Sequence, residues 1–388
     1  MGVPGGFFTI WLAVTVLPVL ALIAIGLSRI GMARRVRSVP DRKARLPCTE
    51  ILIPVKGVFP HQEAALRSML EQNHPCYGLI FILDRDDDPA NALVEELCSH
   101  YLHARKVVAG LSTSCCQKNH NLIEGMRHLT PETEIVVFCD ASNCAERDWL
   151  VRFTGPLCSG DVEVVTTFRT FDPRPRTMAG VCQAIYASFV LILDMVKPKT
   201  WGGATAILRT TFERLDVIGA WSGTVVDDLV LTNVLDRAGV RIRVCPEHLL
   251  CSPLRNQTVR GFLGYLDRQI LFPKFTNPVI WAASVVTHLS LTLALTAVLP
   301  VGLAFLFGLV GQAAGWVTCG VIVGCLAAVL LLRMLNPFSI PMSSWLLAFF
   351  PCMYLASYIF VRSLFINYID WHGRRYWCGR GGKVVRIG

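Results

Sequence analysis

The chain has 388 residues, of which 53% are hydrophobic and only 17% charged, and its formal net charge is +9 at pH 7. Soluble globular chains carry about 25% charged residues, so this composition argues against a protein that is soluble throughout. The positive charge does not indicate nucleic-acid binding, because the sequence has no basic stripe interleaved with aromatic residues. We therefore expect a membrane protein, with membrane lipids and not nucleic acid as partners.

The first apolar run, residues 7–27, contains no charged residue. It is long enough to cross a bilayer, whose core of about 30 Å requires about 20 apolar helical residues. A signal peptide is the alternative, but no basic segment precedes the run, and the apolar part of a signal peptide has only roughly 7–15 residues. The sequence therefore predicts a transmembrane anchor over residues 1–30.

Basic residues follow this run and do not precede it. Cytoplasmic flanks of membrane spans carry an excess of Lys and Arg. The N-terminus is therefore predicted to point outward, and residues 31–278 are predicted to form a cytosolic domain. The basic residues are Arg29, Arg34, Arg35, Arg37, Arg42, Lys43 and Arg45.

Short apolar runs alternate with amphipathic helical patterns in the middle of the chain. This alternation predicts an α/β domain with a parallel sheet covered by helices on both faces. Ligands of such sheets bind where the carboxyl ends of the strands meet, so the loops after the strands should carry the chemistry. The predicted strands are TEILIPV (49–55), LIFIL (79–83), KVVAG (106–110), EIVVFC (134–139) and VEVVTT (162–167), with helices over residues 61–72 and 91–102.

Carboxylates stand directly after two of these strands. Residues 84–88 (DRDDD) repel one another, which predicts a cation or a hydrogen-bonding ligand nearby. The alternative is a solvated acidic turn before a helix that Pro89 begins. Asp140 is placed to hold Mg²⁺ or Mn²⁺ on a diphosphate, because these ions take hard oxygen ligands and share them with phosphate. The alternative for Asp140 is a cap of the following helix.

A glycine pair and an acidic pair follow. Gly202 and Gly203, in WGGATAI (201–207), let the backbone approach a ligand closely. Asp227 and Asp228 open a predicted helix, where a carboxylate can act as a general base. A simple turn and a helix N-cap are the alternatives for the two pairs.

Two further segments suggest contact with the membrane surface. Residues 184–196 are apolar but too short to span, and we predict a core helix there. A surface helix that admits a lipid acceptor is the alternative. Residues 262–275 mix aromatic with basic side chains, as interfacial helices do, so we predict an interfacial segment over about residues 256–278.

The C-terminal part is again apolar, since residues 279–332 and 334–361 carry no charge. Two to three transmembrane helices are predicted over residues 279–366, followed by a basic tail over residues 367–388. The charge of the tail predicts a cytosolic location, whereas three full crossings would place it outside. Either one segment is re-entrant or interfacial, or the charge rule fails.

The fifteen cysteines are scattered and show neither a disulfide framework nor metal-ligand spacing. All fifteen are therefore predicted to be reduced.

The order of these motifs resembles the family 2 glycosyltransferases and, within them, the ceramide glucosyltransferase-like group. The resemblance runs over about residues 48–275. It rests on Lys56-Gly57, the acidic loop ending at Asp88, Gln117-Lys118-Asn119-His120-Asn121-Leu122, Asp140, WGGATAI, Asp227-Asp228, Arg268-Gln269 and the C-terminal Trp371-His372-Gly373-Arg374-Arg375-Tyr376. It implies a nucleotide-sugar-binding glycosyltransferase A-type (Rossmann-like) domain with one N-terminal and two to three C-terminal transmembrane helices.

The resemblance also implies roles for single residues. Asp228 matches the base that deprotonates the acceptor hydroxyl, Asp227 stands beside it, and Arg268 matches the first position of the (Q/R)xxRW motif. Asp140 matches the metal-binding acid, with Mn²⁺ or Mg²⁺ as the cofactor. The donor-binding residues implied are Lys56, Asp88 (uracil and ribose), Lys118, Asn121, Gly202, Gly203 and Gln269.

The implied reaction is an inverting transfer of a hexose, glucose in the first place, from a UDP-sugar to a lipid hydroxyl such as that of ceramide, in a bacterial inner membrane or a Golgi membrane. Two departures stand against the family pattern. Ser142 occupies the place of a second metal carboxylate, and Leu271-Phe272 replace the Arg-Trp pair. A polysaccharide synthase and a catalytically inactive nucleotide-binding membrane subunit remain the alternatives.

Overall fold

The computed structural model describes residues 3–35 and 45–388, so Arg37, Arg42 and Lys43 of the basic cluster lie outside the described residues. The chain divides into two compact units. The sheet unit comprises Ile30–Asp172, Lys197–Arg255 and Asn367–Gly388, and the helical unit comprises Met1–Arg29, Pro173–Val196 and Asn256–Ile366. Each unit is therefore built from three separate segments of the chain.

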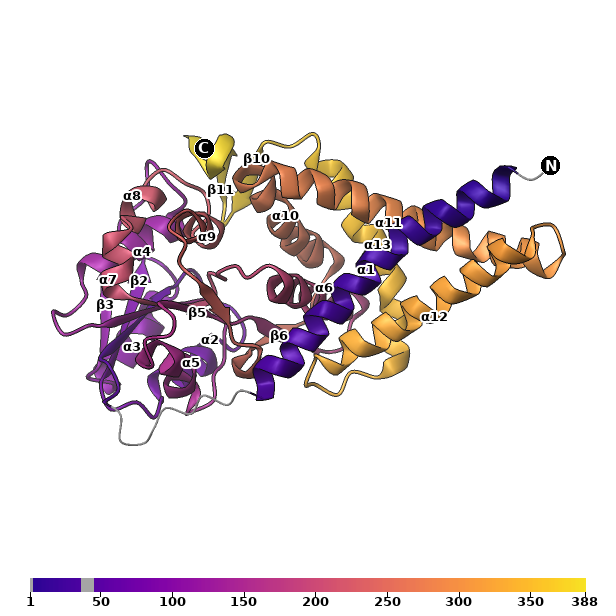
Figure 1. The fold of residues 1–388 in the computed structure, drawn as a ribbon. Coiled ribbons are helices and arrows are strands. Elements are labelled where there is room, and N and C mark those ends of the chain that lie inside the picture. Colours follow the sequence, from indigo (N-terminus) through magenta and orange to yellow (C-terminus); the bar gives the residue numbers. More distant parts are fainter. Residues whose placement is uncertain (1–2, 36–44) are drawn as a thin grey trace. The chain divides into compact units, whose positions relative to one another are not determined.

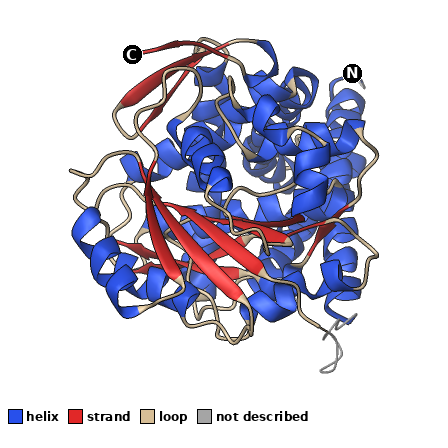
Figure 2. Cartoon of the chain, turned by 90° about the vertical axis from the view of Figure 1, so that its left-hand side faces the viewer, coloured by secondary structure: helices blue, strands red, loops and turns tan. Residues whose placement is uncertain are grey.

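The sheet unit contains a seven-stranded sheet in the order β3-β2-β1-β4-β7-β5-β8. Figure 2 draws the strands in red. The predicted strands all form. The expectation of a purely parallel sheet is wrong for β7, which runs antiparallel to both β4 and β5. The reason is that strand–helix alternation ends after β5, which another strand follows directly, and β7 enters the sheet only after the long helix α6 (Met178–Val196). The strands are β1 (Thr49–Pro54), β2 (Tyr77–Leu83), β3 (Ala104–Val108), β4 (Ile135–Cys139), β5 (Val164–Thr166), β7 (Ala204–Leu208) and β8 (Ile242–Val244).

Helices cover both faces of this sheet, as predicted. Alternate residues of β1 point to opposite faces: Ile51 and Ile53 belong to the core formed with α2, α3 and α5. On the other face, the rings of Phe212 (α7) and Trp221 (α8) pack on Phe138. The helices are α2 (Gln62–Leu70), α3 (Asn91–His100), α4 (Gln117–Arg127), α5 (Trp149–Cys158), α7 (Arg209–Arg214), α8 (Val217–Trp221) and α9 (Asp228–Arg237).

The last residues of the chain fold as part of the sheet unit (Figure 1). They form an antiparallel sheet of β10 (Tyr368–Trp371), β11 (Arg374–Cys378) and β12 (Val384–Ile387), with the short helix η2 (Arg380–Gly382) before β12. A further pair, β6 (Arg169–Arg174) and β9 (Leu250–Arg255), is preceded by the short helix η1 (Pro246–His248). The predicted basic tail is thus an ordered sheet.

The helical unit consists of long apolar helices. Within the described residues, five helices are long and apolar enough to cross a membrane, in α1, α6, α11, α12 and α13. The runs predicted as spans therefore form helices, and α6 has 19 residues because it begins at Met178, ahead of the predicted segment 184–196. The bounds are α1 (Val3–Arg35), α6 (Met178–Val196), α10 (Val259–Thr276), α11 (Pro278–Leu306), α12 (Gln312–Met334) and α13 (Met342–Ser363).

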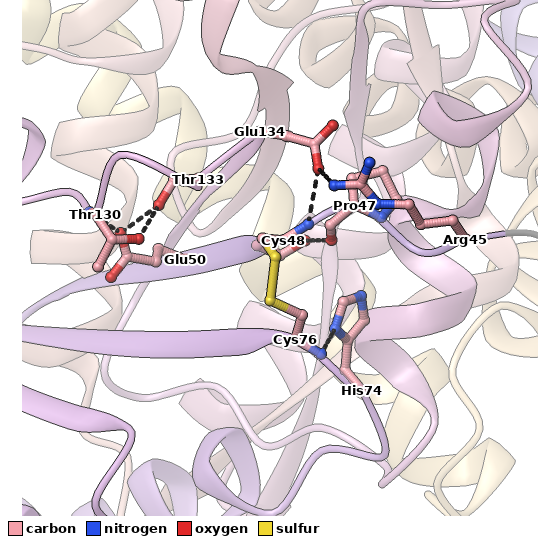
Figure 3. Close-up of a disulfide and its surroundings, with 10 residues drawn as sticks. Arg45, Pro47, Cys48, Glu50, His74, Cys76, Thr130, Thr133 and Glu134 are labelled. Carbon is pink, nitrogen blue, oxygen red and sulfur yellow. Dashed lines mark hydrogen bonds and ion pairs between the residues drawn. A yellow bond between two sulfur atoms is a disulfide. The ribbon is translucent and has the colours of Figure 1, made fainter.

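The prediction that every cysteine is reduced is wrong for two residues. Cys48 and Cys76 form a disulfide (Figure 3). They precede β1 and β2, and because these strands pair in parallel with Thr49 opposite Tyr77, the two Cα atoms lie only 4.8 Å apart. The sequence could not show this proximity, since 28 positions separate the two residues. The other cysteines are free thiols.

Candidate active site

The carboxyl ends of β1, β2 and β4 meet at one edge of the large sheet. Pro54 at the end of β1 lies opposite Ile82, and Leu52 lies opposite Phe138. The loops that leave this edge carry Lys56 and Gly57, the acidic residues 84–88, and Asp140. Parallel pairing thus gathers the residues that sequence analysis placed after separate strands.

The first cluster at this edge joins the loops after β1 and β2. Lys56 Nζ lies 2.5 Å from Asp84 Oδ2 and 3.5 Å from Asp88 Oδ2. Gly57 N donates to Asp88 Oδ1 at 2.8 Å, which holds the β1 loop against the acidic loop. Asp84 Oδ1 is buried and has no hydrogen-bond partner. The cluster therefore contains one buried acceptor whose hydrogen-bonding capacity no described residue satisfies.

The cation predicted beside the acidic loop is supplied by the protein itself. Lys56 pairs with both Asp84 and Asp88, Lys106 Nζ lies 3.1 Å from Asp86, and Arg85 pairs with Asp87 at 2.6 Å. The last two pairs involve exposed carboxylates, and such pairs contribute little to stability. The buried part of the loop, Asp84 and Asp88, is the part that can recognise a ligand.

The second cluster is centred on Lys118, in the first turn of α4. Its Nζ lies 3.0 Å from Asp140 Oδ1 and 3.1 Å from Asp227 Oδ2, and it donates to Gly202 O at 2.9 Å. The nearby carboxylates raise the pKa of Lys118 although burial opposes the charge. Lys118 is therefore a fixed cation that ties α4, the end of β4, the glycine turn and the start of α9 together.

The glycine pair before β7 is required by close packing. A Cβ on Gly202 would lie 2.8 Å from Lys118 Nζ and would also collide with the Asp227 carboxylate. Gly203 O accepts from Asp140 N at 3.1 Å and from the buried Asn143 side chain at 2.8 Å. Any side chain at position 202 would thus displace the lysine from the two acids.

Asp228 occupies the first turn of α9 with its carboxylate held by backbone donors. Gly202 N donates to Oδ2 at 3.0 Å, and Leu229 N donates to Oδ1 at 2.7 Å. Burial and the adjacent Asp227 carboxylate raise the pKa of Asp228 to about 7, although Lys118 opposes the shift. A carboxylate with a pKa near neutrality is suited to act as a general base.

Asp140 is the more accessible of the two acids that Lys118 bridges, with 29% of its side chain exposed against 6% for Asp227. The described residues contain no group of three or more His, Cys, Asp or Glu that could hold a metal ion. Mg²⁺ commonly binds through one or two carboxylates and completes its shell with water and substrate phosphates. Asp140 is therefore the residue that would hold a divalent ion arriving with a diphosphate.

The other predicted residues lie elsewhere. Asn121 is buried, accepts from Gln117 Nε2 at 2.8 Å and donates to Ile82 O, so it holds α4 on the sheet. Arg268 and Gln269 belong to α10 of the helical unit. Within the sheet unit, the structure therefore brings together six predicted residues: Lys118, Asp140, Gly202, Gly203, Asp227 and Asp228.

Sequence reasoning missed a second cation at this cluster. Arg169, on β6, has its Nη1 3.9 Å from Asp140 Oδ2, and its guanidinium lies over the rings of Phe171 and Trp201 at 5.0 and 5.1 Å. No spacing in the sequence marks Arg169, because its link to Asp140 depends on how β6 folds back. The Trp of WGGATAI was the available signal, since an aromatic beside the glycine turn can support a cation.

Comparisons with known proteins bear on the family and on the fold. The chain matches the model of glycosyl transferase family 21 over residues 15–384. No curated protein matches it. A mannosyltransferase from Pyrobaculum calidifontis, solved in complex with GDP-Man and Mn²⁺, is 18% identical with a TM-score of 0.51, and the alignment covers 91% of this chain and 99% of that chain.

A glucosyl-3-phosphoglycerate synthase from M. tuberculosis is 14% identical with a TM-score of 0.35, covering 61% of this chain and 80% of that chain. The likeness to the mannosyltransferase shows a common fold, and the second likeness adds no argument. The α/β sheet unit has the glycosyltransferase A-type fold, as predicted.

Proposed function

Because this chain belongs to glycosyl transferase family 21, we propose that it transfers a hexose, glucose in the first place, from a UDP-sugar to the hydroxyl of a membrane lipid such as ceramide. Family membership makes it a glycosyltransferase, and the donor and acceptor are our proposal. One observation carries it: the Asp228 carboxylate, with its pKa near 7, lies beside a lysine-centred cluster at the ligand-binding edge of the sheet. The motifs of the sequence resemble family 2 glycosyltransferases and their ceramide glucosyltransferase-like group. The family that the chain matches is family 21, and ceramide as the acceptor stays a proposal.

The proposed reaction is a single in-line displacement. Asp228 takes the proton of the lipid hydroxyl, the oxygen attacks the anomeric carbon, and the bond to the diphosphate oxygen breaks as the new glycosidic bond forms. The configuration at the anomeric carbon inverts. Lys118 and Arg169 lie on either side of Asp140 and can stabilise the negative charge that develops on the leaving diphosphate.

A divalent cation, Mn²⁺ or Mg²⁺, would be held by Asp140 and by phosphate oxygens, and would supply further positive charge to the leaving group. Lys56, Asp84 and Asp88 are proposed to bind the uracil and ribose, since they lie at the same sheet edge and Asp84 keeps an unpartnered oxygen. Gly202 and Gly203 let the backbone approach the donor closely.

A lipid acceptor is supported by the apolar helices, which indicate association with a membrane. Arg268 and Gln269 on α10 are proposed to act beside the acceptor, following the family resemblance. The replacement of the Arg-Trp pair by Leu271 and Phe272, both on α10, argues against the polysaccharide synthase. Retention of Asp140 and Asp228 in a connected cluster argues against an inactive subunit.

We propose a cytosolic orientation for the sheet unit, in line with the basic residues that follow the apolar run 7–27. The chain before α6 and the chain after it both belong to the sheet unit, as do the C-terminal residues Asn367–Gly388. If this unit lies on one side of the membrane, α6 begins and ends on that side, so we propose that α6 does not span. By the same argument an even number of full crossings lies between Arg255 and Asn367. Since α11, α12 and α13 are all long and apolar enough to cross, we propose that two of them cross and that the third is re-entrant or interfacial.

The function is tested with the full-length protein purified in detergent. It is incubated with single UDP-sugars and a mixed lipid extract, with Mn²⁺ or Mg²⁺, and the products are identified by mass spectrometry. We expect a lipid that has gained one hexose from UDP-glucose. Asp228→Asn should abolish transfer while UDP binding persists, because the amide cannot take a proton. UDP binding without turnover of any donor by the wild type would favour the inactive subunit.

A further inference from the structure

The C-terminal sheet, formed by β10, β11 and β12, contacts the two segments that position Lys118 and Asp227. One contact is with the start of α4, and the other is with residues 223–225, just before Asp227. All of these residues belong to the sheet unit. The contacts join positions more than a hundred residues apart in the sequence, so no local pattern could indicate them.

Arg374, on β11, makes the first contact. Its Nη1 donates to Gln117 Oε1 at 2.8 Å, and its Nη2 donates to Ser112 O at 2.7 Å. The buried Tyr376 accepts at its hydroxyl from Gln117 N at 3.3 Å. Arg374 and Tyr376 therefore hold the residue that immediately precedes Lys118, through both its side chain and its backbone.

Gln117 in turn fixes the loop and the helix around Lys118. Its Oε1 also accepts from Ser112 N at 2.9 Å, and its Nε2 donates to Gly110 O and to Asn121 Oδ1, each at 2.8 Å. Every polar atom of this amide is thus engaged. The orientation of the first turn of α4, and with it the direction of the Lys118 side chain, depends on this network.

The second contact runs through the backbone. Val225 N donates to Gly382 O at 2.9 Å, and Val384 N donates to Gly223 O at 2.8 Å, with Thr224 and Lys383 paired as a β-bridge. Cys116 N also donates to Thr224 O at 2.9 Å. Hydrogen bonds therefore hold the segment before Asp227 to the C-terminal sheet on one side and to the start of α4 on the other.

We propose that the C-terminal sheet is a positioning element of the active site, in which Arg374 sets the placement of Lys118 between Asp140 and Asp227. The inference rests on the proposed transferase function, because it assigns Lys118 to the leaving diphosphate. Arg374 acts through Gln117 and touches no substrate, so it is a positioning residue. The neighbouring Arg375 provides a matched control, since it lies on the opposite, exposed face of β11 and pairs with Asp370 at 2.7 Å.

The test compares Arg374→Ala, Arg374→Lys and Arg375→Ala in the full-length protein in detergent. We expect Arg374→Ala to lower kcat by about 10- to 100-fold, as small misplacements of catalytic groups do, and to weaken UDP binding. Arg375→Ala should change neither. A lysine at position 374 cannot make both hydrogen bonds of the guanidinium in the same geometry, so the kcat of Arg374→Lys should lie between those of the wild type and Arg374→Ala.

A pH profile separates positioning from a general loss of folding. The charged groups that act on Asp228 are Asp227, which raises its pKa, and Lys118, which lowers it. Lys118 also pairs with Asp140, which Arg169 approaches from β6. If Arg374→Ala displaces Lys118, the rise of kcat with pH should move to higher pH, while folded protein measured by thermal melting is retained. An unchanged pH profile, with kcat equal to that of Arg375→Ala, would overturn the inference.

Two further outcomes are also decisive. If Arg374→Ala does not fold, Arg374→Lys carries the test, and wild-type kcat and pH profile in that folded variant would count against the role of the guanidinium. If the wild type transfers no sugar, the proposed function fails, and the affinity for UDP then tests the positioning role of Arg374. Weaker UDP binding by Arg374→Ala but not by Arg375→Ala supports this role. Equal affinities of the two variants refute it.

Discussion

At the scale of single residues, two adjacent acids have different environments. Asp227 is buried and paired with Lys118 at 3.1 Å, whereas Asp228 accepts backbone N–H groups and has a pKa of about 7. One carboxylate holds the cation and the other is able to take a proton. Enzymes often assign separate roles to paired carboxylates in this way.

This difference predicts the pH dependence. Asp228 acts as a base only when it is deprotonated, so kcat should rise as pH rises through about 7 and then level off. Asp227→Asn removes a negative charge that raises this pKa, so the rise should move to lower pH. Asp227→Glu keeps the charge and is the matched control. If kcat rises at the same pH in the wild type and in Asp227→Asn, the assignment of Asp228 as the base is contradicted.

Gly202 gives a second prediction at this scale. Gly202→Ala places a Cβ against Lys118 Nζ and the Asp227 carboxylate, so transfer should fall by at least about 100-fold because these groups are displaced. Gly264→Ala is the control, because a Cβ there meets no atom within 4 Å. Initial rates with UDP-glucose, measured beside a thermal melt of each variant, provide the comparison. Near-normal turnover of Gly202→Ala would show that the close approach is unimportant.

At the scale of elements, the disulfide joins the starts of two neighbouring strands. Closing a loop between residues 28 positions apart is expected to stabilise the folded state by about 3.5 kcal/mol. Cys48→Ser should therefore lower the denaturant midpoint of the oxidised protein, and the difference from wild type should disappear in reductant. Cys98→Ser, which removes a free thiol, is the control. A difference that persists in reductant would show that the bond itself does not stabilise the fold.

The redox state of Cys48 and Cys76 in the cell also tests on which side of the membrane the sheet unit lies. Cytosolic glutathione keeps thiols reduced, so a sheet unit that faces the cytosol should carry Cys48 and Cys76 as thiols in the cell and form the bond after exposure to air. Alkylation of thiols in intact cells, followed by mass spectrometry, measures the two states. A fully formed disulfide in freshly quenched cells would contradict the proposed cytosolic orientation.

At the scale of the whole molecule, the C-terminal sheet provides a test of the proposed membrane topology. Because Asn367–Gly388 folds with the sheet unit, a tag after Gly388 and a protease site in the exposed turn at Gly160 should lie on the same side of sealed vesicles. The N-terminus, beyond α1, should lie on the opposite side. Digestion from one side at a time tests this, and tags at Gly388 and Gly160 that are cut from different sides would refute the even number of crossings.

The sequence by itself determined the strands of the large sheet and the apolar helices, and it singled out Lys118, Asp140 and Asp228, whose roles stay predictions. These features depend on hydrophobic periodicity and on residue types at strand ends, which are local. Tertiary structure alone decided the antiparallel course of β7, the Cys48–Cys76 bond, the approach of Arg169 to Asp140 and the contact of Arg374 with Gln117. Each of these depends on contacts between residues distant in the chain, and such contacts are fixed only when the sheet pairs and packs.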